Sequence, residues 1–426
     1  MSKVFSGKKK KKSQQSSHPT ESSSSIDFLA KYESELQSLK LNSNFFHTNP
    51  ITRPLPNFPR DDLEFGSVLG IGGFCKVYEI VKIHQGCNEK NLEQHQDEDG
   101  EDEAMHQTNL YMANNTFRDN AARYAVKILR TDLNDDKHNH RGMYDLAIEA
   151  AYLSVLNHPN IVKMRGSMLC DSPVKTDGFF IIIDRLYGTL QEKIDGEWSR
   201  AHKESKGSFG GLFKKDKTAL KNLFLERLLV AHDLATVFRY LHEKRIIYRD
   251  LRPENAGFDV RGDIKLFDFG LCKEIRHDET KAFNPTKVYK FTSRTGSIPY
   301  MAPEIMLCKK YNHKVDTYSF GILLWELFAL KIPMKGFNNY DYVEKVCKKG
   351  FRPNPNESKC PVMTQSIMKE CWAENSLNRP EFARIATVIR GEMNDMTDEN
   401  DGSIRDRTFH LLNRSKNSQH NRNFTR

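Results

Sequence analysis

Apolar residues divide the chain into a strand-rich first part and a helical second part. LEFGSVLGIGGFCKVYEIVKI (63–83) predicts two strands around a glycine turn, and YAVKILR (124–130) predicts a third strand. FFIII (179–183) is a short, continuous apolar run of the kind that forms a buried strand. The first part of the chain is therefore expected to contain a sheet.

Helical patterns are clearest further along the chain. DLAIEAAYLSVL (145–156) has a helical composition, and residues 310 to about 390 are expected to be mainly helical. LFLERLLVAHDLATVFRYLH (223–242) places four apolar side chains on one helical face, namely Val230, Leu234, Phe238 and Leu241. FGILLWELFAL (320–330) carries a glutamate and is too short to cross a bilayer, so it predicts a buried helix.

Polar segments flank and interrupt a domain expected at 61–390. Residues 1–60 are rich in Ser and Lys, which predicts a disordered basic tail. The lysines at 8–12 of this tail are a nuclear signal, a patch that binds anionic surfaces, or simply solvated side chains. An acidic insert (84–122) predicts a disordered loop, with autoinhibition as the alternative. A Gly- and Lys-rich insert (195–218) and a disordered polar tail (391–426) complete the set.

Composition narrows the class of protein. The chain has 426 residues, of which 38% are hydrophobic and 28% charged, as in ordinary globular domains. Its eight cysteines form no CxxC pair, which favours free thiols in a reducing compartment, and no apolar leader follows Met1. A cytoplasmic or nuclear location without a transmembrane segment is therefore expected. The net charge of +9 is no direct indication of a nucleic-acid partner.

Several short stretches carry candidate chemistry. Glycines in GIGGFCKV (70–77) let backbone amides approach an anion, and Lys127 ends an apolar strand. Glu149 lies in a predicted helix, where a carboxylate among apolar residues needs a cation. IIYRDLRPENAGFD (246–259) is a stiff, highly charged loop, and Asp268 in LFDFG could hold Mg²⁺. Each feature alone has an ordinary explanation, such as a hairpin glycine or a snorkelling lysine.

The order of these stretches, followed by Ala-Pro-Glu at 302–304, resembles the signature set of the eukaryotic protein kinases over about residues 64–390. The resemblance implies an α+β fold of two lobes. The small lobe would hold a five-stranded antiparallel sheet and one helix, and the larger lobe would be mainly helical. It also implies an enzyme that transfers the γ-phosphate of ATP, with Mg²⁺, to Ser or Thr hydroxyls of protein substrates.

The resemblance assigns roles in the charged loop. Asp250 would orient and deprotonate the acceptor hydroxyl, with Arg252 near the transferred phosphate. Asn255 and Asp268 would hold Mg²⁺. Ser297 is expected to contact Asp250. Such a reaction depends on positioning and charge stabilisation, which would explain why the loop is held firmly.

Nucleotide binding is assigned in the same way. Lys127, fixed by Glu149, would bind the α- and β-phosphates of ATP. The other implied nucleotide-binding residues are Leu69, Gly70, Gly72, Gly73, Val77, Ala125, Ile183, Asp184 and Leu186. The resemblance also implies a buried Glu304–Arg379 ion pair and an Asp316 that anchors the charged loop.

The chain departs from the family pattern at three positions. Cys75 replaces a glycine, Tyr248 replaces the usual His, and Arg252 replaces the usual Lys, a change that is not conservative. A pseudokinase scaffold that binds nucleotide or partners without catalysis is therefore the alternative, and a small-molecule kinase is a third. CWAENSLNRPEF (371–382) is similar to the tyrosine-kinase-like serine/threonine kinases, which sets the expected branch.

Regulation is expected in the activation segment (residues 268–304). Arg249 precedes the catalytic aspartate, which in this family implies activation by a phosphate that pairs with it. Ser293 is the first candidate, Thr292 the second, and Thr295 a further acceptor. The phosphate would come from autophosphorylation or from an upstream activating kinase.

Two further hypotheses concern thiols and tails. Cys75 and Cys272 would lie near the phosphates and the metal, which could lower their thiol pKa, with an unreactive small residue as the alternative. Because the tails and inserts lie outside the motif span, a chain trimmed to about 60–392 is predicted to keep its activity.

Overall fold

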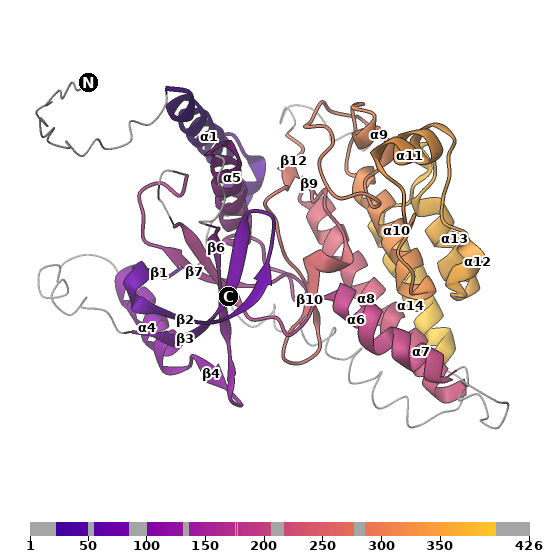
Figure 1. Ribbon diagram of the computed structural model, residues 1–426, viewed down its shortest axis with the longest axis horizontal. Coiled ribbons are helices and arrows are strands. Elements are labelled where there is room, and N and C mark those ends of the chain that lie inside the picture. Colours follow the sequence, from indigo (N-terminus) through magenta and orange to yellow (C-terminus); the bar gives the residue numbers. More distant parts are fainter. Residues whose placement is uncertain are drawn as a thin grey trace, which may run out of the picture.

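The structure is a computed structural model that describes residues 23–49, 55–84, 100–130, 136–174, 176, 178–205, 217–276 and 286–397. It has two lobes, one built on a twisted sheet and one on helices (Figure 1). This arrangement confirms the two-lobed α+β fold that the sequence implies.

A six-stranded sheet forms the small lobe, in the order β1-β7-β8-β6-β3-β2. Its strands are β1 (Asn57–Phe58), β2 (Leu63–Ile71), β3 (Cys75–Ile83), β6 (Tyr124–Leu129), β7 (Met164–Met168) and β8 (Phe180–Asp184). Five of them pair antiparallel, as expected. The sixth, β1, was not expected and pairs parallel with β7. Gly166 permits this approach, since a Cβ there would lie 2.7 Å from the carbonyl oxygen of Pro56.

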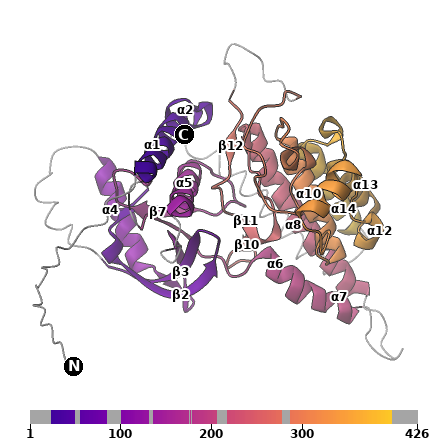
Figure 2. The same ribbon diagram turned by 45° about the horizontal axis from the view of Figure 1, so that its top comes forward.

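One long helix, α5 (Asp136–Leu153), packs on the sheet and carries Glu149. Two further helices lie beside it, α1 (Ser23–Leu41) and α2 (Asn44–Thr48). Helix α1 lies next to α5 in Figures 1 and 2, and Figure 2 shows α2 close to both. The expectation of a disordered tail over 1–60 is therefore wrong for this segment. Leu36, Leu39 and Phe45 are buried, and their burial offsets the loss of chain entropy on ordering.

Parts of both inserts and of the C-terminal tail are also ordered. The acidic insert contains α4 (Gly100–Asn114), β4 (Phe117–Arg118) and β5 (Ala121–Ala122), the second insert contains η2 (Ile194–Trp198) and α7 (Ser199–Ser205), and α14 (Phe382–Thr397) extends past residue 390. Met112, Trp198 and Met393 are buried, so apolar anchors order segments that seemed too polar to fold. The lysines at 8–12, residues 206–216 and the chain beyond 397 lie outside the described residues.

Helix α8 (Lys217–Glu243) and helix α10 (Lys314–Ala329) form the centre of the large lobe. The predicted apolar face of α8 is confirmed, because Val230, Leu234, Phe238 and Leu241 are all buried. Around them lie α6 (Leu190–Lys193), α9 (Pro303–Met306), α11 (Asn339–Asp341), η4 (Tyr342–Lys348), α12 (Pro355–Ser358), α13 (Val362–Cys371) and η5 (Ser376–Asn378). Among the described residues, no helix is long and apolar enough to span a membrane.

Short strands shape the loops between the lobes. Strand β9 (Ile246–Ile247) pairs with β12 (Lys273–Glu274), and β10 (Ala256–Phe258) pairs with β11 (Ile264–Leu266). The short helix η3 (Pro253–Asn255) lies between β9 and β10, and η1 (Arg60–Asp62) lies between β1 and β2 of the sheet. These strands fix both ends of the charged loop at 248–255, named here the Asp250 loop, and the start of the activation segment.

Candidate active site

A lysine from the sheet meets two carboxylates from different elements. Lys127 of β6 places its Nζ 2.5 Å from the carboxylate of Glu149 on α5 and 3.0 Å from that of Asp268. Burial alone would lower the pKa of Lys127, but the carboxylates of Asp268 and Glu149 outweigh it and raise that pKa above its usual value. The ammonium group therefore stays charged and joins the two lobes.

The Asp250 loop is fixed at its backbone by one buried carboxylate. Asp316, at the start of α10, accepts hydrogen bonds from the backbone N–H groups of Tyr248 (2.9 Å) and Arg249 (2.8 Å). The side-chain amide of Asn255 closes the loop by donating to the carbonyl and carboxylate oxygens of Asp250, both at 2.9 Å. The expected anchoring role of Asp316 therefore has a direct geometric basis.

Backbone strain is concentrated in the same region. Arg249 and Asp268 are not glycines, yet they adopt φ angles of 74° and 64°. Gly296 has φ 101°, and a Cβ there would lie 2.4 Å from the carbonyl oxygen of Arg249. Strained conformations persist where surrounding contacts hold them, and they are common at functional sites. Sequence reasoning did not single out Gly296.

A chain of hydrogen bonds runs through Asp250, Ser297 and Arg252. The Ser297 hydroxyl donates to Asp250 (2.8 Å), as expected, and accepts from Arg252 (2.7 Å). Arg252 also donates two hydrogen bonds to Glu254. Burial raises the pKa of Asp250, an effect that Asp268 adds to and that the hydrogen bonds only partly offset. A raised pKa makes a carboxylate a better proton acceptor near neutral pH.

The apolar residues expected around the nucleotide come together in one cluster. Ala125 and Ile183 belong to the hydrophobic cluster that also contains the α5 core residues, and the partly buried Leu69, Val77 and Leu186 pack against it. The Asp184 carboxylate accepts from Arg165 at 2.6 and 2.8 Å, so this side chain is engaged in an ion pair. The backbone N–H of Asp184 donates to the carbonyl of Lys163 at 3.0 Å.

The glycine turn between β2 and β3 leaves space above its backbone. A Cβ at Gly70 or Gly73 would meet no atom within 4 Å, whereas Gly72 lies against the carbonyl of Cys75, to which its N–H donates at 2.8 Å.

Cys75 itself points into the core, and burial raises the pKa of its thiol to about 12. Burial also raises the pKa of Cys272. Both directions are opposite to the lowering that bound Mg²⁺ and Lys127 were predicted to cause, and they favour the alternative of an unreactive small residue.

Arg249 already has three partners in the structure. Its guanidinium donates to the carbonyl of Leu271 (2.6 Å), the hydroxyl of Thr292 (2.8 Å) and the hydroxyl of Tyr311 (3.2 Å). The structure thus brings the second phosphosite candidate, Thr292, directly to this arginine. Tyr311 carried no signal in the sequence that could have found it.

Two structural features accompany the site. The side chain of Arg379, which is fully buried, donates to the Glu304 carboxylate at 2.5 and 3.0 Å, the ion pair that the sequence implied. Tyr248 packs edge-on against Phe269, with ring centroids 5.3 Å apart, and its hydroxyl donates to the carbonyl of Phe267. The unusual tyrosine therefore both packs and satisfies its polar group.

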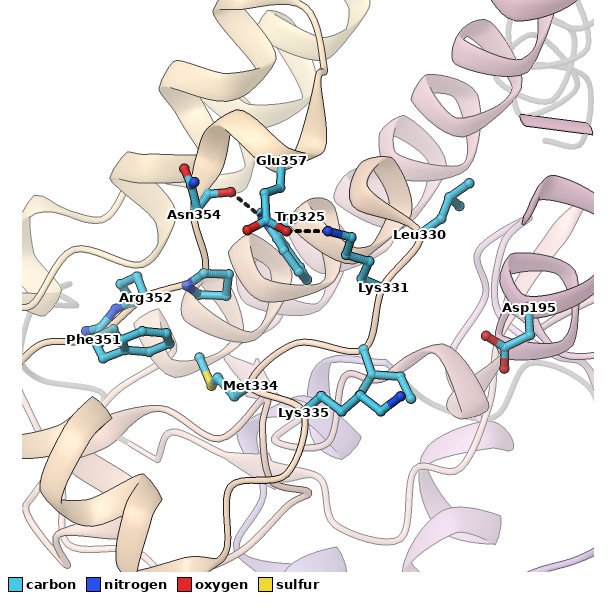
Figure 3. A pocket seen from close by; sticks show the side chains of 12 residues that line it. Asp195, Trp325, Leu330, Lys331, Met334, Lys335, Phe351, Arg352, Asn354 and Glu357 are labelled. Carbon is cyan, nitrogen blue, oxygen red and sulfur yellow. Dashed lines mark hydrogen bonds and ion pairs between the residues drawn. The ribbon is translucent and has the colours of Figure 1, made fainter. Parts of the chain in front are cut away.

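A separate pocket of about 700 Å³ lies in the large lobe (Figure 3). Trp325, Met334 and Phe351 line it together with Lys331 and other polar residues, and it shares no residue with the Asp250 loop. Two of its charged groups are engaged with each other, since Lys331 pairs with Glu357 at 2.6 Å. The candidate site is the meeting point of the lobes rather than this pocket.

Comparison with known proteins agrees with this geometry. The family model described as protein tyrosine and serine/threonine kinase matches residues 63–389, and the chain therefore belongs to this family. The serine/threonine/tyrosine-protein kinase HT1 of Arabidopsis thaliana is 30% identical over 266 residues, which cover 62% of this chain and 59% of that protein. The serine/threonine-protein kinase VIK of the same plant is 31% identical over 265 residues, which cover 61% of this chain and 52% of VIK.

A more distant relative broadens the range of acceptors. The dual specificity protein kinase pyk3 of Dictyostelium discoideum is 28% identical over 272 residues, 63% of this chain and 17% of pyk3. The aligned part thus spans little more than half of HT1 and VIK and far less of pyk3.

The residues present fit the nucleotide and metal that the family implies. The open space above Gly70 and Gly73 would let backbone N–H groups reach a phosphate. The amide nitrogen of Asn255 is engaged with Asp250, which leaves its oxygen as the atom for a cation. Asp268 supplies a half-exposed carboxylate, and oxygen ligands of this kind suit Mg²⁺.

Proposed function

We propose that this protein is an ATP- and Mg²⁺-dependent protein kinase that phosphorylates Ser or Thr hydroxyls of protein substrates. The observation that carries the proposal is the complete set of ion pairs around Lys127, with Glu149 at 2.5 Å and Asp268 at 3.0 Å, next to the Asp250 loop. A scaffold that binds nucleotide would use the same Lys127–Glu149 pair, so catalysis is favoured chiefly by the fixed Asp250 carboxylate beside it, which Asn255 holds at 2.9 Å. The alternative is a pseudokinase that binds nucleotide or partners without catalysis.

The Asp250 carboxylate would orient the acceptor hydroxyl and take its proton. Its raised pKa and its fixed position support this role. Lys127 would bind the α- and β-phosphates, and Arg252 would stabilise charge on the transferred group. Asn255 and Asp268 would hold Mg²⁺, which neutralises phosphate charge when it is bound.

The acceptor preference rests on the Asp250 loop and on Ser297. Glu254 and Asn255 follow Pro253, a sequence that resembles kinases specific for Ser and Thr. The Ser297 hydroxyl lies directly on Asp250, where tyrosine kinases usually carry Pro. Phosphorylation of tyrosine is the second candidate function, because HT1 and pyk3 are named as kinases with broader specificity.

Phosphate incorporation by the purified full chain tests the function. We expect transfer from ATP to a generic protein substrate only with Mg²⁺, and mainly to Ser and Thr in phosphoamino-acid analysis. Asp250→Asn and Lys127→Met should lower the rate by at least about 100-fold, since each removes a group that acts in the transition state. A folded Asp250→Asn variant with the wild-type rate would contradict the assignment, and nucleotide binding without any transfer would favour the scaffold.

A further inference from the structure

Helices α1 and α2 lie where they can control the position of Glu149. We propose that they form a clamp that holds α5 against the sheet, so that Glu149 remains paired with Lys127. The clamp would act as a positioning element for phosphotransfer, and in this respect the inference rests on the proposed function. The prediction that a chain trimmed to about 60–392 keeps its activity would then be wrong.

The first part of the clamp contacts α5 directly. The ring of Tyr32 on α1 stacks on the ring of Tyr144 on α5, with centroids 4.7 Å apart and an interplanar angle of 24°. Burial and the nearby Glu35 carboxylate of α1 raise the pKa of Tyr144. Leu36 and Leu39, one helical turn apart, are buried in the core that contains Leu146 and Ile148 of α5.

The second part of the clamp packs against the C-terminal end of α5. Phe45 and Phe46 of α2 surround the ring of Tyr152, with centroid distances of 5.9 and 5.5 Å. Tyr152 is fully buried and lies one helical turn after Glu149. The clamp therefore contacts α5 on both sides of Glu149 along the helix, at Tyr144 and at Tyr152.

The clamp also reaches the large lobe. The backbone N–H of Phe45 donates to the buried carboxylate of Glu274 at 2.8 Å. Lys244, between α8 and β9, donates to the side chain of Asn49. Arg276 donates to the carbonyl of Ser38 at 3.3 Å. These contacts connect α1 and α2 to the large lobe as well as to α5.

The strand pair that the clamp contacts lies next to the catalytic residues. Glu274 pairs with Ile246 across β12 and β9, and Ile247 leads directly into the Asp250 loop. Gly270 lies so close to α5 that a Cβ there would be 2.9 Å from the carbonyl oxygen of Asp145. The clamp therefore fixes the distance between α5 and the elements that carry Asp250 and Asp268.

Substitutions at two leucines of α1, one buried and one exposed, test whether the clamp positions Glu149. Leu39 is 4% exposed and Leu41, two residues away on α1, is 72% exposed. In the full chain, Leu39→Ala should lower kcat about 10- to 100-fold, because small misplacements of catalytic groups have effects of this size. Leu41→Ala should leave kcat unchanged, and the volume-conserving Leu39→Met should restore most of it. The KM for a protein substrate should change little.

Hydrogen exchange measured by mass spectrometry supplies an independent test. In Leu39→Ala, amides of 136–153 should exchange faster, while those of α10 should not change. Tyr32→Ala, which removes only a partly buried ring, should show the same pattern if Leu39→Ala does not fold. Folded variants with wild-type kcat and wild-type exchange in α5 would overturn the clamp. If the wild-type protein itself transfers no phosphate, the proposed function fails, and the exchange pattern still decides for or against the clamp.

Discussion

At the scale of single residues, the three departures from the family pattern are accommodated by specific contacts. Cys75 fills a buried position, and Tyr248 packs on Phe269. Arg252 holds Glu254 and Ser297 at once, which a lysine with its single ammonium group could do less well. The order of motifs was enough to find these positions. The contact between Arg249 and Thr292 was not predictable, because it depends on the path of the activation segment in space.

We expect Thr292, rather than Ser293, to be the regulatory phosphosite. Its hydroxyl is 2.8 Å from the Arg249 guanidinium, so a phosphate there would add strong acceptors to an existing contact. Thr292→Ala should lower kcat about tenfold or more, given that a charged hydrogen bond contributes about 1.5–3 kcal/mol. Thr292→Ser should stay active and phosphorylated. Mass spectrometry and kinetics would refute this if only Ser293→Ala were impaired.

At the scale of elements, α10 both fills the core and holds the Asp250 loop. Its residues from Lys314 to Phe328 are all buried, and Asp316 at its start binds two backbone N–H groups of the loop. The apolar run predicted the buried helix. The helix α1 escaped prediction for the opposite reason, because its few apolar residues become significant only when α5 is there to cover them.

Replacing Asp316 should therefore weaken both stability and catalysis. An asparagine offers one oxygen to two N–H groups, so one backbone donor loses its partner. We expect Asp316→Asn to lower the free energy of unfolding by about 1.5–3 kcal/mol and also to reduce kcat. Urea denaturation and steady-state kinetics would measure the two effects. The exposed Asp171→Asn serves as the control, and equal behaviour of both variants would contradict this role.

At the scale of the whole molecule, one set of buried ion pairs connects the two lobes and another stabilises the large lobe. Lys127 joins α5 to Asp268, and Glu304 pairs with Arg379. The lobes and these pairs follow from the motifs. The helices α1, α4 and α7 could not be predicted from the motifs. A mostly polar segment folds only where a neighbouring surface buries its few apolar side chains.

A buried acid should make the stability of the molecule depend on pH. Burial raises the pKa of Glu326 from 4.5 to about 8, and Tyr300 donates to its carboxylate. The folded protein thus binds this proton more tightly than the unfolded chain, so the stabilisation is complete below 4.5 and is lost as pH rises toward 8. The loss should be on the order of a few kcal/mol, at about 1.4 kcal/mol for each pKa unit.

Urea denaturation across this pH range tests that expectation. Glu326→Gln keeps an acceptor for Tyr300 without a charge, so its stability should vary less with pH than that of the wild type. Glu374→Gln, at an exposed position, should retain the wild-type dependence. Parallel pH curves for wild type and Glu326→Gln would show that this carboxyl is not responsible.

The short strand β1 has a consequence for how the clamp can open. Its pairing with β7 fixes the chain at Asn57, and only residues 49–56 separate the end of α2 at Thr48 from that anchor. A chain of this length spans about 30 Å at most, so released helices would remain near their binding site. Their local concentration would be on the order of millimolar. Release would thus be a reversible equilibrium within one molecule, independent of protein concentration, and a free peptide of the same sequence would compete only at millimolar levels.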